Sequence, residues 1–398
     1  MQLPGQLLNS LEGIAGFQKD TFEKTHQSGE QVTSLRINPA KQTGFPSVQA
    51  AHTNIPWTAY GYYLNERPSF TFDPLFHAGC YYVQEASSMF LEQAVKQTAD
   101  LSQPLKVLDL CAAPGGKSTH LQSLLSGDSL LVSNEVIRTR AQVLRDNIIK
   151  WGCDNVMVTN NDPKDFAQLE NYFDVIVVDA PCSGSGLFRR DPGAIEEWSE
   201  NNVQLCSRRQ QRILADLWPA LKQNGILIYS TCSYSSAEDE AITDWLELEL
   251  DARYLPLVTD VDWGIVDTGK GYRFWPDKVK GEGFFIACFR KNGGDQAPVI
   301  RSKTKPELLT KKELMVLDNW VKESGHVFIK HAQTVYAWPG KLAGDFSWLL
   351  EKLRVIYSGT LVGELVRDKL VPDHALALSR LPADGVRNST LDKEEAIA

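Results

Sequence analysis

The chain has 398 residues, of which 43% are hydrophobic and 23% charged, enough for the cores of two or three ordinary soluble domains. Its seven cysteines are scattered and form no C-x-x-C pair, which disfavours both a disulfide framework and a zinc site. The N-terminus lacks a secretory signal, and no apolar run approaches the roughly 18 residues that span a membrane. We therefore expect a reduced cytoplasmic protein that binds neither a metal nor a membrane.

Charge is distributed unevenly along the chain. The net charge of −9 argues at first against a nucleic-acid partner. Residues 301–380, however, carry thirteen Lys and Arg against nine Asp and Glu, a local charge of +4 (13 − 9). A mildly basic C-terminal segment beside an acidic remainder is compatible with RNA binding without demonstrating it.

The first 95 residues combine helix, strand and aromatic signals. Apolar periodicity predicts a helix over Leu7–Phe22, and a short alternating stretch predicts a strand over Val32–Asn38. Residues 60–90 are rich in Phe and Tyr, which could stack on RNA bases, although packing within the protein is their more common role. We predict a small α+β domain over residues 1–95.

Residues 96–291 alternate between strand and helix signals, the pattern of a doubly wound parallel α/β sheet. The predicted strands are Lys106–Cys111, Ser129–Asn134, Val156–Thr159, Phe173–Val178 and Gly225–Ser230. The predicted helices are Ser118–Leu125, Arg138–Trp151 and Arg208–Leu221. A later pair of strands, predicted to be antiparallel, covers Tyr272–Trp275 and Gly283–Phe289.

The last hundred residues form a further predicted unit. Residues 292–305 are polar and contain proline, which predicts a linker. A helix over Lys311–Ser324 and several short strands then predict an α+β domain over residues 306–398. The sequence closes on LDKEEAIA, typical of the opening of a helix, which leaves open a continuation of the natural protein past Ala398.

A glycine-rich turn follows the first strand of the central region, in the stretch KVLDLCAAPGGKSTHL from Lys106 to Leu121. Strand, glycine-rich turn and helix bring backbone N–H groups to a nucleotide-like ligand. Gly116-Lys117-Ser118 matches the end of a phosphate-binding P-loop, but that motif also requires glycine where this chain has Cys111. The alternative is the adenosine-cofactor turn of a methyltransferase.

Three acids follow successive strands of the predicted sheet. Glu135 comes after the second strand, Asp162 after the third and Asp179 after the fourth. A carboxylate at the end of the second strand suits a ribose diol, and one after the third suits an adenine amino group. Three acids in register beyond a Gly-Gly turn favour a mononucleoside cofactor.

Two cysteines lie at the same predicted edge. Cys182 follows Asp-Ala-Pro after the fourth strand, and Cys232 ends the fifth. If these strands are neighbours, their ends lie ~5 Å apart and both thiols can face one pocket. A lone cysteine is more often a small buried hydrophobe, whereas a thiolate at a ligand edge is a strong nucleophile.

Together these motifs resemble the Sun-type (Nol/Nop/Sun) RNA cytosine-C5 methyltransferases, most closely the bacterial small-subunit rRNA enzymes of the RsmF type. The resemblance runs in motif order from about residue 80 to 291 and implies a Rossmann-like class I methyltransferase core that uses S-adenosylmethionine. The residues that carry it are CAAPGGK (Cys111–Lys117), DAPCSGSG (Asp179–Gly186), STCS (Ser230–Ser233) and GEGFF (Gly281–Phe285), with Arg273 and Pro276 upstream of the last.

The resemblance also implies residue roles. Cys232 would attack C6 of cytosine, Asp179 would assist at N3 between cofactor and base, and Cys182 would assist release of the product. Glu135 would hold the ribose, and Asp162 would lie near the adenine. The residues expected around the methionine portion are Cys111, Ala112, Ala113, Pro114, Gly115, Gly116 and Lys117. The target base must leave its stack, so a single-stranded or loosened RNA is the expected partner of a monomeric enzyme.

The flanking units resemble the family less closely. The N-terminal unit is similar to its small RNA-binding subdomain. Near the C-terminus, Tyr357–Glu364 and Pro372–Leu378 resemble the appendage of bacterial members that modify small-subunit rRNA, which implies a PUA-like RNA-docking domain. The expected substrate is 16S rRNA. The alternative substrate is transfer RNA. The alternative functions are those of an ATP-using P-loop protein and of a non-catalytic ribosome-assembly factor that binds RNA.

Overall fold

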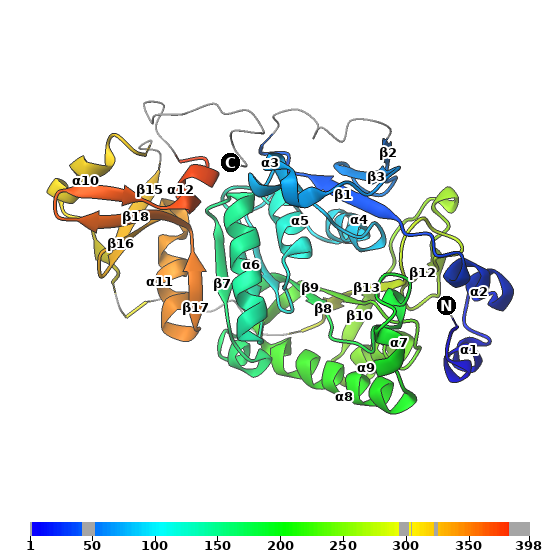
Figure 1. Ribbon diagram of the computed structural model, residues 1–398. Coiled ribbons are helices and arrows are strands. Elements are labelled where there is room, and N and C mark those ends of the chain that lie inside the picture. Colours follow the sequence, from blue (N-terminus) through cyan, green and yellow to red (C-terminus); the bar gives the residue numbers. More distant parts are fainter. Residues whose placement is uncertain (1, 42–51, 294–301, 304, 322–324, 382–398) are drawn as a thin grey trace.

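The computed structural model describes residues 2–41, 52–293, 302–303, 305–321 and 325–381. Most of the predicted linker and the tail beyond Leu381 therefore lie outside the described residues. Three sheets organise the chain: a small one near the N-terminus, a large central one and a third near the C-terminus (Figure 1). Among the described helices, none has the length and apolar character needed to cross a bilayer.

The central sheet has ten strands and a parallel middle. Its spatial order is β11-β12-β13-β9-β8-β5-β6-β7-β17, with β10 paired to β13. Five strands pair in parallel: β5 (Lys106–Asp109), β6 (Leu130–Asn134), β7 (Val156–Thr159), β8 (Phe173–Asp179) and β9 (Leu221–Thr231). The antiparallel flanks are β10 (Ala252–Leu255), β11 (Val266–Asp267), β12 (Tyr272–Phe274), β13 (Phe284–Lys291) and β17 (Val355–Ser358). The doubly wound sheet and the antiparallel pair predicted from the sequence are thus confirmed.

Helices cover both faces of this sheet (Figure 1). On one face lie α4 (Leu91–Thr98), α5 (Gly116–Leu124) and α6 (Arg138–Trp151), and on the other α8 (Glu200–Leu217) and α9 (Glu240–Glu249). Successive strand side chains point to opposite faces. Val107 and Leu108 of β5 accordingly belong to different core clusters, and both are buried. Burial on both faces explains the continuous apolar runs in the sequence.

The direction of winding reverses between β5 and β8. From β5 the chain proceeds outward through β6 to β7, and it then returns to place β8 and β9 on the other side of β5. Such a reversal opens a crevice at the carboxyl ends of the strands, where ligands of this fold class bind. The turn after β5 and the end of β8 both lie at this switch point.

The extents of two helices outside the C-terminal unit were predicted wrongly. The single helix expected over Leu7–Phe22 is two, α1 (Gly5–Leu11) and α2 (Lys19–Gln27), because Gly13 and Gly16 between them adopt positive φ. The helix predicted from Arg208 begins eight residues earlier, where the Ser199 side chain caps Asn202 N–H.

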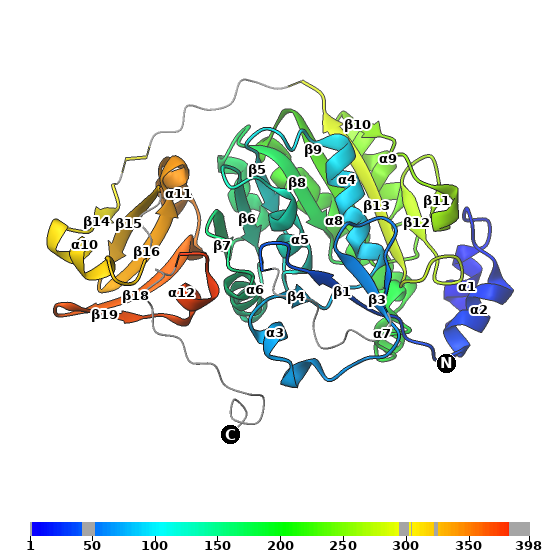
Figure 2. The ribbon, with the colours of Figure 1, turned by 90° about the horizontal axis from the view of Figure 1, so that it is seen from above.

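The N-terminal unit contains a four-stranded antiparallel sheet that packs over the core (Figure 2). In spatial order its strands are β2 (His52–Asn54), β3 (Gly61–Leu64), β1 (Thr33–Ile37) and β4 (Tyr81–Tyr82). The short helix α3 (Pro74–His77) lies between β3 and β4 in the chain. The helix α2 is fixed separately, because Phe22 packs edge-on against Tyr234 and Trp275 of the core.

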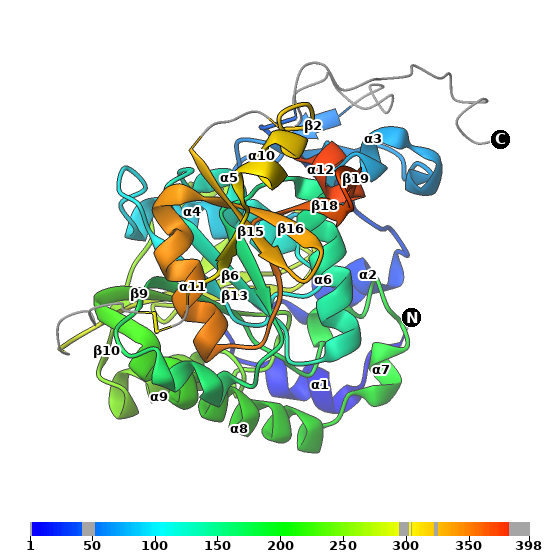
Figure 3. The ribbon, with the colours of Figure 1, turned by 90° about the vertical axis from the view of Figure 1, so that its left-hand side faces the viewer.

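The C-terminal unit, which faces the viewer in Figure 3, carries the third sheet. Its strands are β14 (Glu307–Leu308), β15 (His326–His331), β16 (Thr334–Pro339), β18 (Thr360–Val366) and β19 (Lys369–Pro372). Its helices are α10 (Lys311–Leu317), α11 (Ala343–Lys352) and α12 (His374–Leu378), so α10 ends earlier than predicted. Strand β17 leaves this unit and pairs with β7 of the core. The predicted domain boundaries and the PUA-like assignment stay predictions.

Candidate active site

The turn after β5 begins the site. Gly115 has φ +114°, a conformation that side-chain-bearing residues rarely adopt, and a Cβ there would lie 3.3 Å from Leu144 Cδ1. Arg140 and Asn147 of α6 donate hydrogen bonds of 2.8 Å to the carbonyls of Ala113 and Pro114. The turn is therefore held from α6, with Gly115 leading into the first turn of α5.

A buried acid that the sequence interpretation did not single out lies under this turn. Asp109, the last residue of β5, is fully buried, and its Oδ2 accepts a 2.6 Å hydrogen bond from Ser118 Oγ. Burial raises the pKa of Asp109 to about 7. Its Oδ1 has no hydrogen-bond partner among the described residues. The sequence signal that could have singled out Asp109 is its position as a charged residue inside an otherwise apolar strand.

Glu135 and Asp162 lie at the ends of β6 and β7, as expected from the sequence. Glu135 is buried, accepts a hydrogen bond from Ile137 N–H at 2.9 Å and lies 3.5 Å from the Arg140 guanidinium. Asp162 is half-buried and caps the short helix Pro163–Gln168 through Lys164 N–H. Both positions suit a nucleoside ligand, and their predicted roles remain untested.

Lys117 and Asp179 form an ion pair across the switch point. Lys117 Nζ lies 2.8 Å from Asp179 Oδ2, and Ser230 Oγ donates to Asp179 Oδ1 at 2.9 Å. Burial opposes the charge of Lys117, but the neighbouring Asp179 carboxylate raises the pKa of this lysine above its usual value. Lys117 is only 12% exposed and is paired with Asp179, so it is poorly placed to contact nucleotide phosphates as a P-loop lysine does.

The two cysteine thiols meet at the same edge. Strands β8 and β9 are paired, with Asp179 opposite Ser230, and Cys182 Sγ lies 3.1 Å from Cys232 Sγ. Both are free cysteines, at a separation well beyond the ~2.05 Å of a disulfide. The hydrogen bond to Cys232, followed by burial, raises the pKa of Cys182. The expectation that the two thiols lie together at one edge of the sheet is confirmed, whereas a shared pocket and their chemical roles remain predictions.

Glu238 connects the two loops that carry the cysteines. This fully buried carboxylate accepts hydrogen bonds from Ser183 N–H at 2.7 Å, Ser183 Oγ at 2.5 Å and Ser233 Oγ at 2.6 Å. Each serine directly follows one of the cysteines. Burial raises the pKa of Glu238, and the three donors oppose that rise. The sequence interpretation missed this residue, whose only signal was the acidic run Glu238-Asp239-Glu240.

A buried arginine supports the same loops from β12. Arg273 donates to both oxygens of Glu240 at 2.6 Å and lies 3.1 Å from Asp239. Asp239 in turn accepts a 2.6 Å hydrogen bond from Thr231, the residue before Cys232. A bidentate pair of this kind fixes geometry as well as charge. The site is therefore backed by a rigid polar layer.

The fold and this edge define a Rossmann-like methyltransferase architecture, and comparisons identify the family. The family described as "16S rRNA methyltransferase RsmB/F" matches residues 97–290, and the "N-terminal domain of 16S rRNA methyltransferase RsmF" matches residues 3–86. A ribosomal RNA small subunit methyltransferase F from Shewanella denitrificans is 30% identical over 85% of this chain and 69% of its own. The chain belongs to the RsmB/F family of 16S rRNA methyltransferases, which are S-adenosylmethionine-dependent enzymes.

Other similar proteins share part of the chain. The Pectobacterium atrosepticum ribosomal RNA small subunit methyltransferase F is 34% identical over 65% of this chain and 56% of its own. A solved methyltransferase homolog from Pyrococcus horikoshii, 28% identical, superposes with a TM-score of 0.57 over 73% of this chain and all of that one. The chain spans between half and about two thirds of the length of the curated relatives named here. No cluster of three or more His, Cys, Asp or Glu suited to a metal is present in the described residues.

Proposed function

We propose that this protein methylates C5 of a cytosine in RNA, specifically 16S rRNA, with S-adenosylmethionine as methyl donor and Cys232 as nucleophile. The observation that carries the proposal is the contact of the Cys182 and Cys232 thiols beside the Lys117–Asp179 pair. Family membership and the names of the relatives support RNA as the substrate. Both cysteines are half-buried and lie at the carboxyl ends of the central strands, where ligands of this fold class bind.

The residues of the edge fit the cofactor. The backbone of Cys111–Gly116 forms the turn between β5 and α5, the buried Glu135 suits the ribose hydroxyls, and Asp162 lies where the adenine is expected. The unpartnered Asp109 Oδ1 leaves an acceptor free beneath the turn. When bound, S-adenosylmethionine supplies an electrophilic methyl group.

Cys232 would activate the base. Addition of its thiolate to C6 of cytosine makes C5 nucleophilic, so that C5 can take the methyl group. Protonation of N3 would favour this addition, with the N3–H donating to the Asp179 carboxylate, which Lys117 and Ser230 hold in position. The charge of Lys117 also interacts favourably with a Cys232 thiolate.

Release completes the proposed reaction. A base must take the C5 proton, and the electron pair of the C5–H bond then forms the C5–C6 double bond and expels the Cys232 thiolate, which returns the aromatic pyrimidine. Cys182 contacts Cys232 Sγ directly and is placed to assist this step. Glu238, which bonds to the residue after each cysteine, would keep the two thiols in register.

The flanking units would select the substrate. The N-terminal unit and the C-terminal sheet extend the surface on either side of the catalytic core, and we propose that both contact RNA, the latter as a PUA-like domain of a monomeric enzyme. A target base must be swung out of its stack to reach Cys232, which favours single-stranded or loosened RNA.

Methyl transfer from tritiated S-adenosylmethionine tests the proposal. Incubation with 16S rRNA, small ribosomal subunits or transfer RNA should yield 5-methylcytosine in a ribosomal substrate, identified by mass spectrometry of nucleosides. Cys232→Ala should abolish the product, whereas Cys153→Ala, a half-buried cysteine outside this edge, should retain it. A different methylated nucleoside, or labelling of transfer RNA alone, would contradict the proposal.

A further inference from the structure

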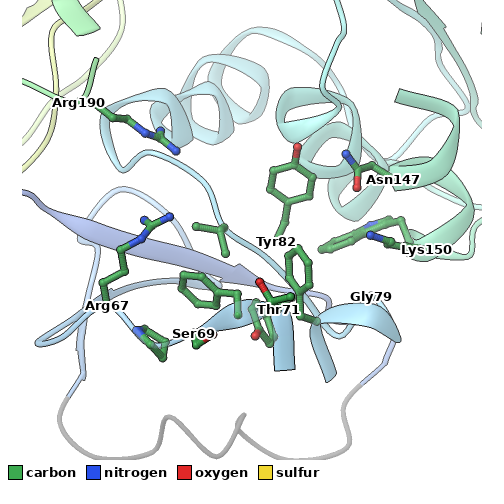
Figure 4. Close-up of a pocket in the computed structure, with 14 residues that line it drawn as sticks. Arg67, Ser69, Thr71, Gly79, Tyr82, Asn147, Lys150 and Arg190 are labelled. Carbon is green, nitrogen blue, oxygen red and sulfur yellow. The ribbon is translucent and has the colours of Figure 1, made fainter. Parts of the chain in front are cut away.

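A second hollow lies between the N-terminal unit and α6, with a volume of about 460 Å³ (Figure 4). Its walls come from the segment before α3, from β4, from the C-terminal half of α6 and from Arg190. Neither the turn at Cys111–Lys117 nor the two reactive cysteines line it. It is therefore separate from the edge that holds the proposed chemistry.

The hollow is positively charged. Arg67, Lys150 and Arg190 all line it, and none of the described residues that line it is an Asp or Glu. Within the part of the chain that the structure describes, none of the three has an ion-pair partner. In Figure 4 the guanidinium groups of Arg67 and Arg190 approach from opposite walls at one end, while Lys150 lies at the other. In a protein of net charge −9, this concentration of unpaired cations favours an anionic ligand.

Aromatic rings accompany the cations. Phe70, Phe76 and Tyr82 line the hollow, and each is only partly buried. Lys150 Nζ lies 5.0 Å from the Phe76 ring, and the Arg67 guanidinium lies 5.6 Å from the Phe70 ring. Cations interleaved with partly exposed aromatic faces form the surface on which single-stranded nucleic acids bind, because bases stack and phosphates pair with the cations.

The hollow borders the proposed active site through two contacts. The Tyr82 ring lies against Gly116, where a Cβ would be 3.4 Å away, and Asn147 donates to the Pro114 carbonyl. Arg190 lies eight residues after Cys182, on the same loop, and its backbone N–H bonds to Leu187. An RNA strand with its target base at Cys232 can therefore place an adjoining nucleotide here.

We propose that this pocket binds a nucleotide that flanks the target cytosine in single-stranded RNA. The base packs against Phe70, Phe76 and Tyr82, and the phosphate lies between Arg67 and Arg190. The pocket gives the N-terminal unit a specific task, which is to fix the register of the strand relative to the reactive thiols. This inference rests on the proposed function and adds the second point at which the RNA is held.

Binding of a fluorescein-labelled, mixed-sequence single-stranded RNA, followed by anisotropy over a range of salt, tests the pocket. The double variant Arg67→Gln/Arg190→Gln should bind at least about tenfold more weakly, and the slope of log affinity against log salt should fall by about 0.7, the value for one lost phosphate contact. The control is Arg253→Gln on β10, an exposed arginine across the core from β4 (Figure 2), which should change affinity less than about twofold. An equal loss of RNA affinity in the double variant and in Arg253→Gln would overturn the inference.

Two further measurements separate this inference from the proposed function. The double variant should have a higher KM for RNA and a nearly unchanged KM for S-adenosylmethionine. If the wild type methylates RNA and the double variant has the same KM for RNA, only the pocket assignment fails. If the wild type binds RNA through the pocket yet transfers no methyl group, only the proposed function fails.

RNA containing 5-iodouridine should crosslink to peptides with Phe70, Phe76 or Tyr82. Crosslinks confined to residues 302–381, or competition by cytidine monophosphate as strong as by RNA, would contradict a flanking-nucleotide site.

Discussion

At the scale of single residues, the turn after β5 shows how neighbouring positions meet different demands. Gly115 is needed for its backbone, since its φ of +114° excludes most side chains. Lys117, two residues later, is needed for its charge, which holds Asp179 at the switch point. The resemblance of Gly-Gly-Lys-Ser to a P-loop therefore reflects shared backbone requirements and not shared chemistry.

The demand on Gly115 predicts a sharp effect of Gly115→Ala. A Cβ at this φ would be strained by about 1–3 kcal/mol and would press on Leu144 at 3.3 Å, so the turn should shift. We expect affinity for S-adenosylmethionine, measured by calorimetry, to fall about tenfold or more. Gly127→Ala is the matched control, because a Cβ there meets nothing within 4 Å. Unchanged cofactor affinity in Gly115→Ala would contradict the assignment of this turn.

At the scale of elements, the loops after β8 and β9 act as one unit because α9 begins beside both. Glu238, just before α9, bonds to the serine that follows each cysteine. Arg273 of β12 then ties Asp239 and Glu240 together. The carboxylate of Glu238, at the end of the loop after β9, thus ties that loop to the loop after β8 and holds the two thiols together.

This arrangement predicts the behaviour of Glu238→Gln. The amide keeps the size of the side chain but brings N–H groups toward three donors, so at least one buried group loses its partner at a cost of about 1–3 kcal/mol. We expect kcat to fall about tenfold while affinity for S-adenosylmethionine is retained, together with an altered pH profile for alkylation of Cys232. Gln in place of the exposed Glu247 on α9, the variant Glu247→Gln, should behave as wild type. A loss of stability with an unchanged alkylation profile would reduce Glu238 to a structural residue.

Elements whose signals are local were predicted well from the sequence. Helix α6 and strand β7 have the predicted bounds, Arg138–Trp151 and Val156–Thr159, because burial on two faces and helical periodicity leave clear patterns. The contact between Cys182 and Cys232 was also anticipated, since parallel neighbouring strands end at one edge. Glu238 and β17 were not, because their roles depend on partners far away in the chain that no local pattern records.

At the scale of the whole molecule, the three sheets are joined by shared packing. Strand β17 extends the core sheet beside β7, and Trp338 and Phe346 of the C-terminal unit belong to the same apolar cluster as Leu130 of β6. On the other side, Phe22 anchors α2 against core aromatics. Movement of either flanking unit would therefore disturb the core that positions the thiols.

Two buried histidines make the stability of this assembly dependent on pH. Burial lowers the pKa of His26 and of His120 to about 4, from an ordinary value near 6.5. Between these values the unfolded chain binds more protons than the folded one, so stability is present above pH 6.5 and is lost as pH falls toward 4. The free energy of unfolding should fall by about 1–2 kcal/mol per histidine between pH 7 and pH 5.

Urea denaturation at a series of pH values measures this dependence. His26→Gln should flatten the slope between pH 5 and pH 7, whereas the exposed His77→Gln should leave it unchanged. An equal slope in the wild type and both variants would show that His26 does not titrate in this way.

The proposed mechanism depends most on the different roles of the two cysteines, and trapping of a covalent protein–RNA complex tests these roles directly. Cys182→Ala should accumulate a complex with substrate RNA that survives denaturing electrophoresis, because the Cys232–C6 bond forms but is not released. Cys232→Ala should give neither complex nor 5-methylcytosine. Methyl transfer by Cys232→Ala, or a stable complex that forms only through Cys182, would contradict the assignment.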